Sequence, residues 1–134
     1  MKLVSLKDEG AADVATGIDK KGRKEVASVL SGVLADSYTL ALKTLNYHWN
    51  VTGPHFQSLH AMFQEQYSAL LLATDELAER IRALGYLAPG SFREFSSLAC
   101  IQEDKSTPAN WQAMVKNLLA GHEHLASHIR GALP

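Results

Sequence analysis

Two histidines and two carboxylates in this chain have the residue types and the spacing of a metal site. His48 lies five residues before the Gly-Pro pair at 53–54 and His60 lies six residues after it, so a helical hairpin turning there would bring both imidazoles to a similar height. Asp75 and Glu79 are four residues apart, so a helix would project both carboxylates from one face. Two imidazoles with two carboxylates suit a borderline cation such as ferrous iron, manganese or zinc.

Each pair also has a purely structural interpretation. Both histidines fall on apolar helical stripes, where an imidazole can simply be a hydrogen-bonded part of the core. The two carboxylates can form a solvated helix edge, with Arg80 and Arg82 as their ion-pair partners. The residue types alone do not decide between these interpretations and a metal site.

Distance along one helix decides which of these groups can meet. His60 and Asp75 are fifteen residues apart, which is about 22 Å of helix, whereas metal–ligand bonds are roughly 2 Å long. They can share an ion only if a second copy packs its helix antiparallel across a two-fold axis near Ser68 and Ala69, whose small side chains allow close approach. The chain has no Glu-x-x-His sequence, which argues against a di-iron site inside one bundle.

Three apolar stripes predict the long helices that position these residues. Apolar residues at steps of three and four run over residues 25–53, 56–84 and 111–129. A short helix is predicted within residues 91–101, in the loop between the second and third stripes. No segment alternates with a period of two, so the predicted fold class is all-α, an antiparallel helical bundle.

The ends of the chain complete this prediction. Residues 1–22 mix Gly, Asp and Lys without periodicity and are expected to form a flexible tail before a single bundle domain, residues 23–134. Thr107 is predicted to cap the last long helix, with Pro108 in its first turn. A fourth long stripe is missing, so the groove beside three helices needs another chain or stays exposed.

The composition is that of an ordinary globular protein without a global attraction to nucleic acid. Its 134 residues include 13 basic and 14 acidic ones, a formal net charge of −1. No run reaches the roughly 18 apolar residues of a membrane helix, and the start has no apolar signal core. The single cysteine, Cys100, cannot form a disulfide within the chain, so a reducing cytoplasm is expected.

One long motif resembles the miniferritins that are called DNA-binding proteins from starved cells. It consists of His48-Trp49-Asn50-Val51-x-Gly53, Phe56, His60, Asp75-x-x-Ala78-Glu79-Arg80 and Leu84-Gly85. The likeness extends over residues 25–134 and implies a ferritin-like bundle with a short helix in its central loop. In that family the two histidines and the Asp/Glu pair form a ferroxidase centre across a dimer two-fold axis.

The resemblance also implies an activity and an assembly. Ferrous iron would be oxidised, preferably by hydrogen peroxide, and ferric mineral would be stored inside a hollow dodecamer, which protects DNA because iron and peroxide are consumed together. Trp49, beside the expected ligand His48, would sit near the centre and take up stray oxidising equivalents; plain core packing is its alternative role.

Two departures from the family pattern change the expectations. Many relatives carry an acidic ligand four residues after the second histidine, where this chain has Gln64, and Glu65 points about 100° away on a helix. Because an amide adds no negative charge, a second iron ion is expected to bind more weakly. Family members normally continue into a fourth helix, and its absence affects the expected cage more than the dimer site.

Two other functions stay open at this point. A nucleoid-associated DNA-binding module with weak catalysis is one, and a truncated family member that does not assemble is the other. The basic residues of the first 24 positions can contact phosphates, although four acidic residues offset them and no aromatic residue is interleaved; they are Lys2, Lys7, Lys20, Lys21, Arg23 and Lys24. Near the C-terminus His124 and His128 form an i, i+4 pair, with His122 close by, that can bind a metal or lie on an exposed helix surface.

Overall fold

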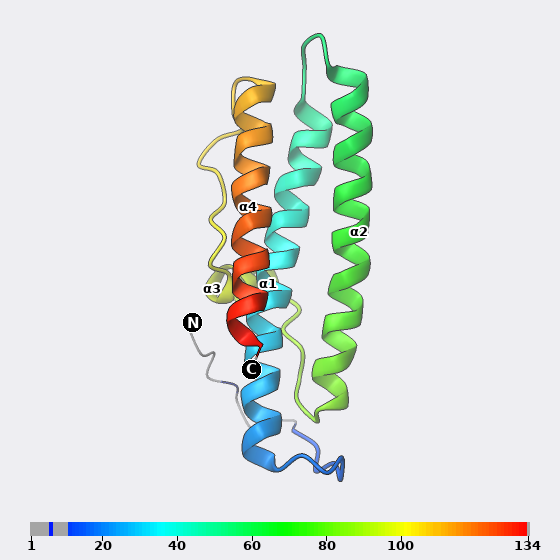
Figure 1. Cartoon of the computed structure of the whole chain (residues 1–134), viewed down its shortest axis with the longest axis vertical. Coiled ribbons are helices and arrows are strands. Elements are labelled where there is room, and N and C mark those ends of the chain that lie inside the picture. The colour runs from blue at the N-terminus through cyan, green and yellow to red at the C-terminus, as the bar shows by residue number, and fades with distance from the viewer. Residues whose placement is uncertain (1–5, 7–10, 134) are drawn as a thin grey trace.

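The computed structural model describes residue 6 and residues 11–133, which form an elongated bundle of helices (Figure 1). Three helices are long and one is short: α1 (Lys20–Asn50), α2 (Phe56–Ala83), α3 (Phe92–Leu98) and α4 (Trp111–Ala132). α1 and α2 form an antiparallel hairpin, and α4 runs back along α1 after a connection that contains α3 (Figure 1). The described residues contain no β-strand, and the predicted all-α fold with a short helix in the central loop is confirmed.

Two helix starts differ from the prediction, and local hydrogen bonds explain both. α1 begins at Lys20 rather than near residue 25, because the Asp19 carboxylate accepts a hydrogen bond from the Gly22 amide at 2.7 Å and caps the helix there. The prediction that Thr107 caps α4 is wrong. Asn110 caps this helix, because its side-chain oxygen accepts a hydrogen bond from the Ala113 amide at 2.9 Å. Thr107 instead hydrogen-bonds the side chain of Asn46 on α1 at 3.3 Å.

Part of the predicted tail lies against the end of α2. Gly85 has φ of +90°, and a Cβ there would come within 2.5 Å of the Ala12 carbonyl oxygen, so only glycine fits. Ala12 donates its amide to the Gly85 carbonyl at 2.7 Å. Arg23 is buried, donates to the Leu84 carbonyl at 3.1 Å and lies 3.5 Å from Asp13. The sequence suggested that Arg23 can contact DNA phosphates. This suggestion is wrong, because the Arg23 side chain is buried.

The remainder of the predicted basic tail is only partly visible. Lys2 and Lys7 fall at positions 1–5 and 7–10, which lie outside the described residues. Lys21 is exposed and forms an ion pair with Glu25 at 3.9 Å. Lys20 and Lys21 are thus the exposed lysines of the described part of the tail, and Glu25 partly offsets the charge of Lys21.

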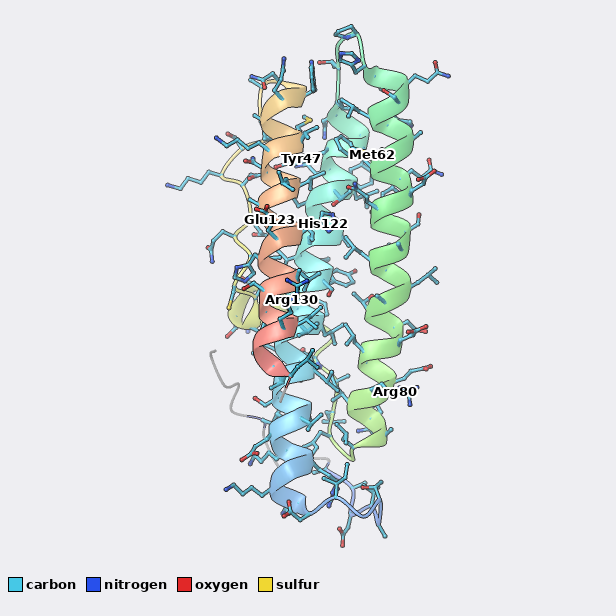
Figure 2. The ribbon with its side chains drawn as sticks, in the orientation of Figure 1. Tyr47, Met62, Arg80, His122, Glu123 and Arg130 are labelled. Carbon is cyan, nitrogen blue, oxygen red and sulfur yellow. The ribbon has the colours of Figure 1, made fainter. Side chains whose placement is uncertain are left out.

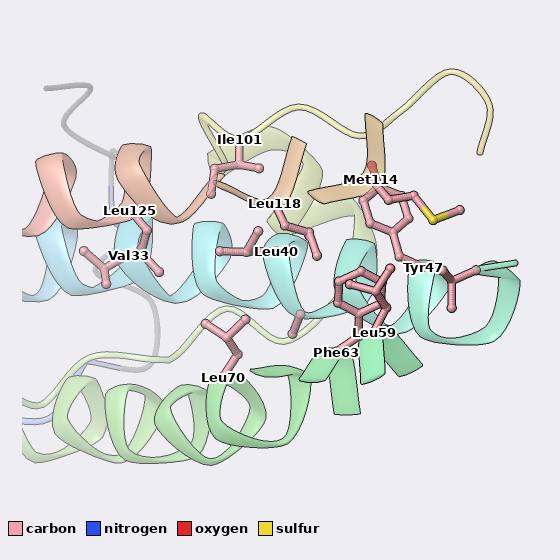
Figure 3. Packing of buried hydrophobic residues seen from close by; sticks show 12 residues of the cluster. Val33, Leu40, Tyr47, Leu59, Phe63, Leu70, Ile101, Met114, Leu118 and Leu125 are labelled. Atoms are coloured by element: carbon pink, nitrogen blue, oxygen red, sulfur yellow. The ribbon is translucent and has the colours of Figure 1, made fainter. Parts of the chain in front are cut away.

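α1 is the central helix of the bundle, because α2, α3 and α4 each pack against it. Tyr47 and Leu40 of α1 face Phe63 and Leu70 of α2 and Leu118 of α4 in one apolar cluster (Figure 3). A second cluster joins the first half of α1 to the end of α2 and to α3. Burial on several sides explains why residues of the first stripe that are not apolar, such as Ser31 and Thr44, donate to their own helix carbonyls.

α2 and α4 both contact α1, yet they share no comparable contact with each other in the described part of the chain. Several large apolar side chains on these two helices are exposed; they include Phe56, Met62, Leu71, Leu72, Leu119 and Ile129. Association with another copy, as the sequence predicts, would bury such surface. No helix among the described residues is both long enough and apolar enough to cross a bilayer.

Candidate metal centre

The imidazoles of His48 and His60 lie side by side across the α1–α2 hairpin. Their ring centroids are 3.7 Å apart and their planes differ by 18°. His48 lies five residues before the turn at 53–54 and His60 lies six residues after it, so the antiparallel hairpin places them at a similar height. The geometric expectation is therefore met, while their role as metal ligands stays a prediction.

Two reciprocal hydrogen bonds fix how these rings can act. The Nδ1 atom of His48 lies 2.8 Å from the His60 carbonyl, and the Nδ1 atom of His60 lies 2.8 Å from the His48 carbonyl. A carbonyl oxygen only accepts, so each Nδ1 must carry the proton and donate it. In the neutral rings both Nε2 lone pairs are then free for a metal ion, which is the arrangement that usually orients histidine ligands.

Aromatic side chains enclose the two imidazoles. Phe56 stacks on His60 with ring centroids 5.0 Å apart, and Tyr67 packs its edge against His48 at 5.3 Å. His48 is only 7 % exposed, whereas His60 is half-buried. The pair is therefore packed among aromatic side chains, with His48 buried and His60 more exposed.

Asp75 and Glu79 lie far along α2 from this pair. The helix places them fifteen and nineteen residues after His60, or roughly 22 and 28 Å. Both carboxylates are exposed. Arg80 and Arg82 do not pair with them in the described residues, and Arg82 instead donates to the Tyr86 carbonyl at 2.8 Å. Within the described part of one chain, the imidazoles thus have no carboxylate beside them and the two carboxylates have no cationic partner.

The surface of α2 between the two groups is suited to a close contact. Ser68 and Ala69, the predicted pivot of a two-fold axis, are both exposed. Gln64 and Glu65 are exposed as well, one helical turn after His60. Gln64 offers an amide oxygen at this position and adds no negative charge.

Trp49 does not pack in the core, so that alternative is wrong. Its side chain is 64 % exposed although the neighbouring His48 is buried, because successive helix residues point about 100° apart. It lines a surface cavity of about 300 Å³ together with Asn46, Lys43 and Asp104. The indole therefore stands in solvent one residue away from the histidine pair.

A polar network beside this cavity was not predicted from the sequence. The Tyr47 hydroxyl donates a short hydrogen bond to Asp104 and accepts one from Asn117 at 3.2 Å, and Asp104 pairs with Lys43 at 3.4 Å. Tyr47 is labelled in Figure 2. Burial, and next the bond to Asp104, raise the pKa of the Tyr47 hydroxyl far above its ordinary value. Tyr47 therefore stays protonated and ties α1 to α4 and to the preceding loop.

A second group of potential ligands was found only in part from the sequence. The pair His124 and His128 was noted there as a possible metal site, but their partner Asp36 on α1 was not. A signal was present in the sequence, because Asp36 directly follows the apolar run Val33-Leu34-Ala35, whose residues are buried. Sequence spacing does not show which distant histidines such an aspartate meets.

Comparison with known proteins gives a consistent family. The profile of the ferritin-like domain matches residues 28–133. An uncharacterized low temperature-induced protein of Nostoc sp. is 40% identical over 114 residues, which cover 85% of this chain and 64% of that protein. The DNA protection during starvation protein of Helicobacter pylori is 30% identical over 102 residues, covering 76% of this chain and 71% of that protein.

The fold comparison agrees with the sequence comparison. The crystal structure of the DPS protein from Vibrio cholerae, described as a member of a superfamily of ferritin-like diiron-carboxylate proteins, superimposes with a TM-score of 0.83. It is 30% identical and the match covers 90% of this chain and 78% of that one. The chain spans less than two thirds of the Nostoc relative's length.

Proposed function

Because this chain belongs to the ferritin-like family and, within it, to the DNA-protection (Dps) proteins, we propose that it oxidises ferrous iron at a centre that two copies share. The observation that carries the proposal is the stacked pair His48 and His60, whose reciprocal Nδ1 bonds leave both Nε2 atoms free. Such a pair supplies two neutral ligands and no charge. Carboxylate ligands from elsewhere are therefore needed to bind a ferrous ion and to stabilise its ferric product.

The partner copy is the proposed source of those carboxylates. An antiparallel contact between two α2 helices, centred near Ser68 and Ala69, would bring Asp75 and Glu79 of the partner subunit to the histidines of the first. Both pivot residues and both carboxylates are exposed in the single chain, which supports this arrangement. Two-fold symmetry then makes two equivalent centres in each dimer.

In this centre iron is the substrate and the side chains bind and neutralise it. Each ferrous ion gives up one electron, so two ions reduce one hydrogen peroxide molecule, which takes up two protons and leaves as two water molecules. The Nε2 atoms of His48 and His60 orient the ion, and the carboxylate oxygens favour the more highly charged ferric product. Gln64 supplies no charge, so a second iron ion would be held more weakly.

Trp49 has a separate part in the proposal. Its exposed indole, one residue from His48, would donate an electron when a single oxidising equivalent escapes the centre. Ferric mineral would accumulate inside a closed dodecameric shell, in the bacterial cytoplasm and near the nucleoid. The names of the relatives as DNA protection proteins support this purpose.

A carboxylate variant tests the proposal directly. Asp75→Asn keeps the size of the side chain but removes its charge, so fast iron oxidation should be lost, by at least about tenfold in initial rate. The assay follows the absorbance of the ferric product after ferrous iron and peroxide are added. Glu76→Gln is the matched control, because this exposed carboxylate is adjacent in sequence and points elsewhere. An Asp75→Asn protein that oxidises iron like the control would refute the assignment.

A further inference from the structure

Three potential ligand atoms from distant parts of the chain converge on the α1–α4 contact. The Oδ2 atom of Asp36 lies 2.8 Å from Nδ1 of His128 and 3.6 Å from Nε2 of His124. One ligand atom from each of the three residues lies within 4.8 Å of the others. The residues come from α1 and from successive turns of α4, so the packing of these two helices assembles the group.

The two oxygens of the Asp36 carboxylate have different surroundings. Its Oδ1 atom accepts the amides of Cys100 and Ile101 at 2.6 and 2.8 Å, which holds the side chain against the loop after α3. Its Oδ2 atom faces the two imidazoles. The carboxylate is therefore oriented by the backbone, with one oxygen available, as hydrogen-bonded metal-ligating carboxylates usually are.

The charge of Asp36 needs compensation. The side chain is fully buried, and a buried carboxylate is costly unless it is hydrogen-bonded and paired with a cation. Among the described residues, the basic groups within 4.0 Å of it are the imidazoles of His124 and His128, which are not permanently charged. The nearby Lys43 pairs with Asp104 instead.

The separations between these three side chains are compatible with ligands of a single metal ion. Two ligands of a tetrahedral ion with bonds of about 2.0–2.1 Å are roughly 3.3 Å apart. The observed separations of 2.8 and 3.6 Å lie on either side of this value. A hydrogen bond accounts for the position of His128, whereas His124 lies too far from Asp36 for one.

We propose that Asp36, His124 and His128 bind a divalent transition-metal ion, of which Zn²⁺ is the best match to two imidazoles and one carboxylate. A fourth position is left for water, because His124 is 45 % exposed and lines an open cavity of about 260 Å³. This cavity is also lined by Cys100, Asn117 and other residues of the α3–α4 loop and α4.

This site is separate from the proposed ferroxidase centre. Asp36 precedes His48 by twelve residues of α1, which is about 18 Å of helix. All three ligands belong to one chain, so no second copy is needed. A glycine makes room for the site, because a Cβ at Gly32 would come within 3.2 Å of the His128 ring.

Zinc binding to a protein without the first site provides the test. In a His60→Ala/Asp75→Asn background, which removes a histidine and a carboxylate of the ferroxidase centre, equilibrium dialysis against ZnCl₂ should find one Zn²⁺ ion bound per chain. Adding His124→Gln should weaken this binding at least about tenfold. Glu123→Gln is the control, because Glu123 is exposed on the same turn of α4 and should leave the binding unchanged.

A second measurement separates ligand loss from misfolding. Zn²⁺ should raise the midpoint of thermal unfolding in the background protein, since a ligand of the folded state stabilises it, and should not do so after His124→Gln. Without zinc both proteins should unfold at similar temperatures, because His124 is half-exposed and His128, not His124, makes the hydrogen bond to Asp36. Absence of stoichiometric zinc in the background, or zinc binding that His124→Gln and Asp36→Asn leave unchanged, would overturn the proposal.

Discussion

The sharing of one centre between two copies can be tested by mixing two inactive chains. One chain carries His60→Ala and the other carries Asp75→Asn, and both are produced together so that dimers assemble at random. The centre that uses His60 of the first chain and Asp75 of the second lacks both groups. The opposite centre of the same dimer keeps its histidines and both carboxylates intact.

The expected recovery follows from the symmetry. Random assembly puts one chain of each kind into about half of the dimers, and one of the two centres in each mixed dimer is intact, so about a quarter of all centres are active. A centre inside a single chain would give no recovery, because each chain lacks one of its groups. This difference depends on the roughly 22 Å between His60 and Asp75 on one helix.

The assay is the initial rate of iron oxidation per chain, with the mixing ratio verified by mass spectrometry. A control mixture of Glu76→Gln and Asp75→Asn chains provides the scale, because about half of its centres should be active under either arrangement. Recovery near half of this control supports a shared centre. A mixture no faster than the sum of its two inactive parents, with the control active, would refute the two-fold arrangement.

Two further predictions concern stability. Gly121→Ala should lower the free energy of unfolding measured in urea, because the new Cβ would lie 2.6 Å from the side chain of the fully buried Leu40. Overpacking costs about 1–3 kcal/mol, which exceeds the helix-propensity gain of about 0.5–1 kcal/mol. Gly131→Ala on the same helix meets nothing within 4 Å and should be neutral or stabilising, and equal effects of the two changes would contradict the packing. Burial lowers the pKa of His122, so the folded chain resists a proton that the unfolded chain accepts, and stability should fall as the pH drops below about 6.5. His122→Gln should make this fall shallower when unfolding is measured across pH with a chelator present, and an unchanged slope would show that His122 is not responsible.

Several features of the fold follow from local sequence patterns. Apolar stripes with a helical period predict α1, α2 and α4, because each stripe records one buried face of one continuous helix. The end of α2 before Gly85 is predicted for a similar local reason, a glycine that takes a positive φ. Helix starts are harder, since both Thr107 and Asn110 are acceptable caps and only the path of the loop selects one.

The candidate metal centre also has features that the sequence predicts and features that it does not. The contact between His48 and His60 could be predicted from the sequence. The two residues lie at similar distances along the chain from one tight turn, and an antiparallel hairpin places such residues side by side. The exposure of Trp49 could not be predicted, because its burial depends on whether another segment covers that face of α1.

The group around Asp36 depends entirely on the tertiary structure. The aspartate is 92 residues from His128 in sequence, and no local pattern relates them. Helical spacing predicts that His124 and His128 share one face of a helix, whereas Asp36 was not singled out from the sequence. Only the packing of α4 on α1, together with the loop amides of Cys100 and Ile101, decides that these side chains meet. A local sequence pattern thus predicts which face of a helix is buried. The partner of a buried charge is instead decided by contacts between segments that are distant along the chain.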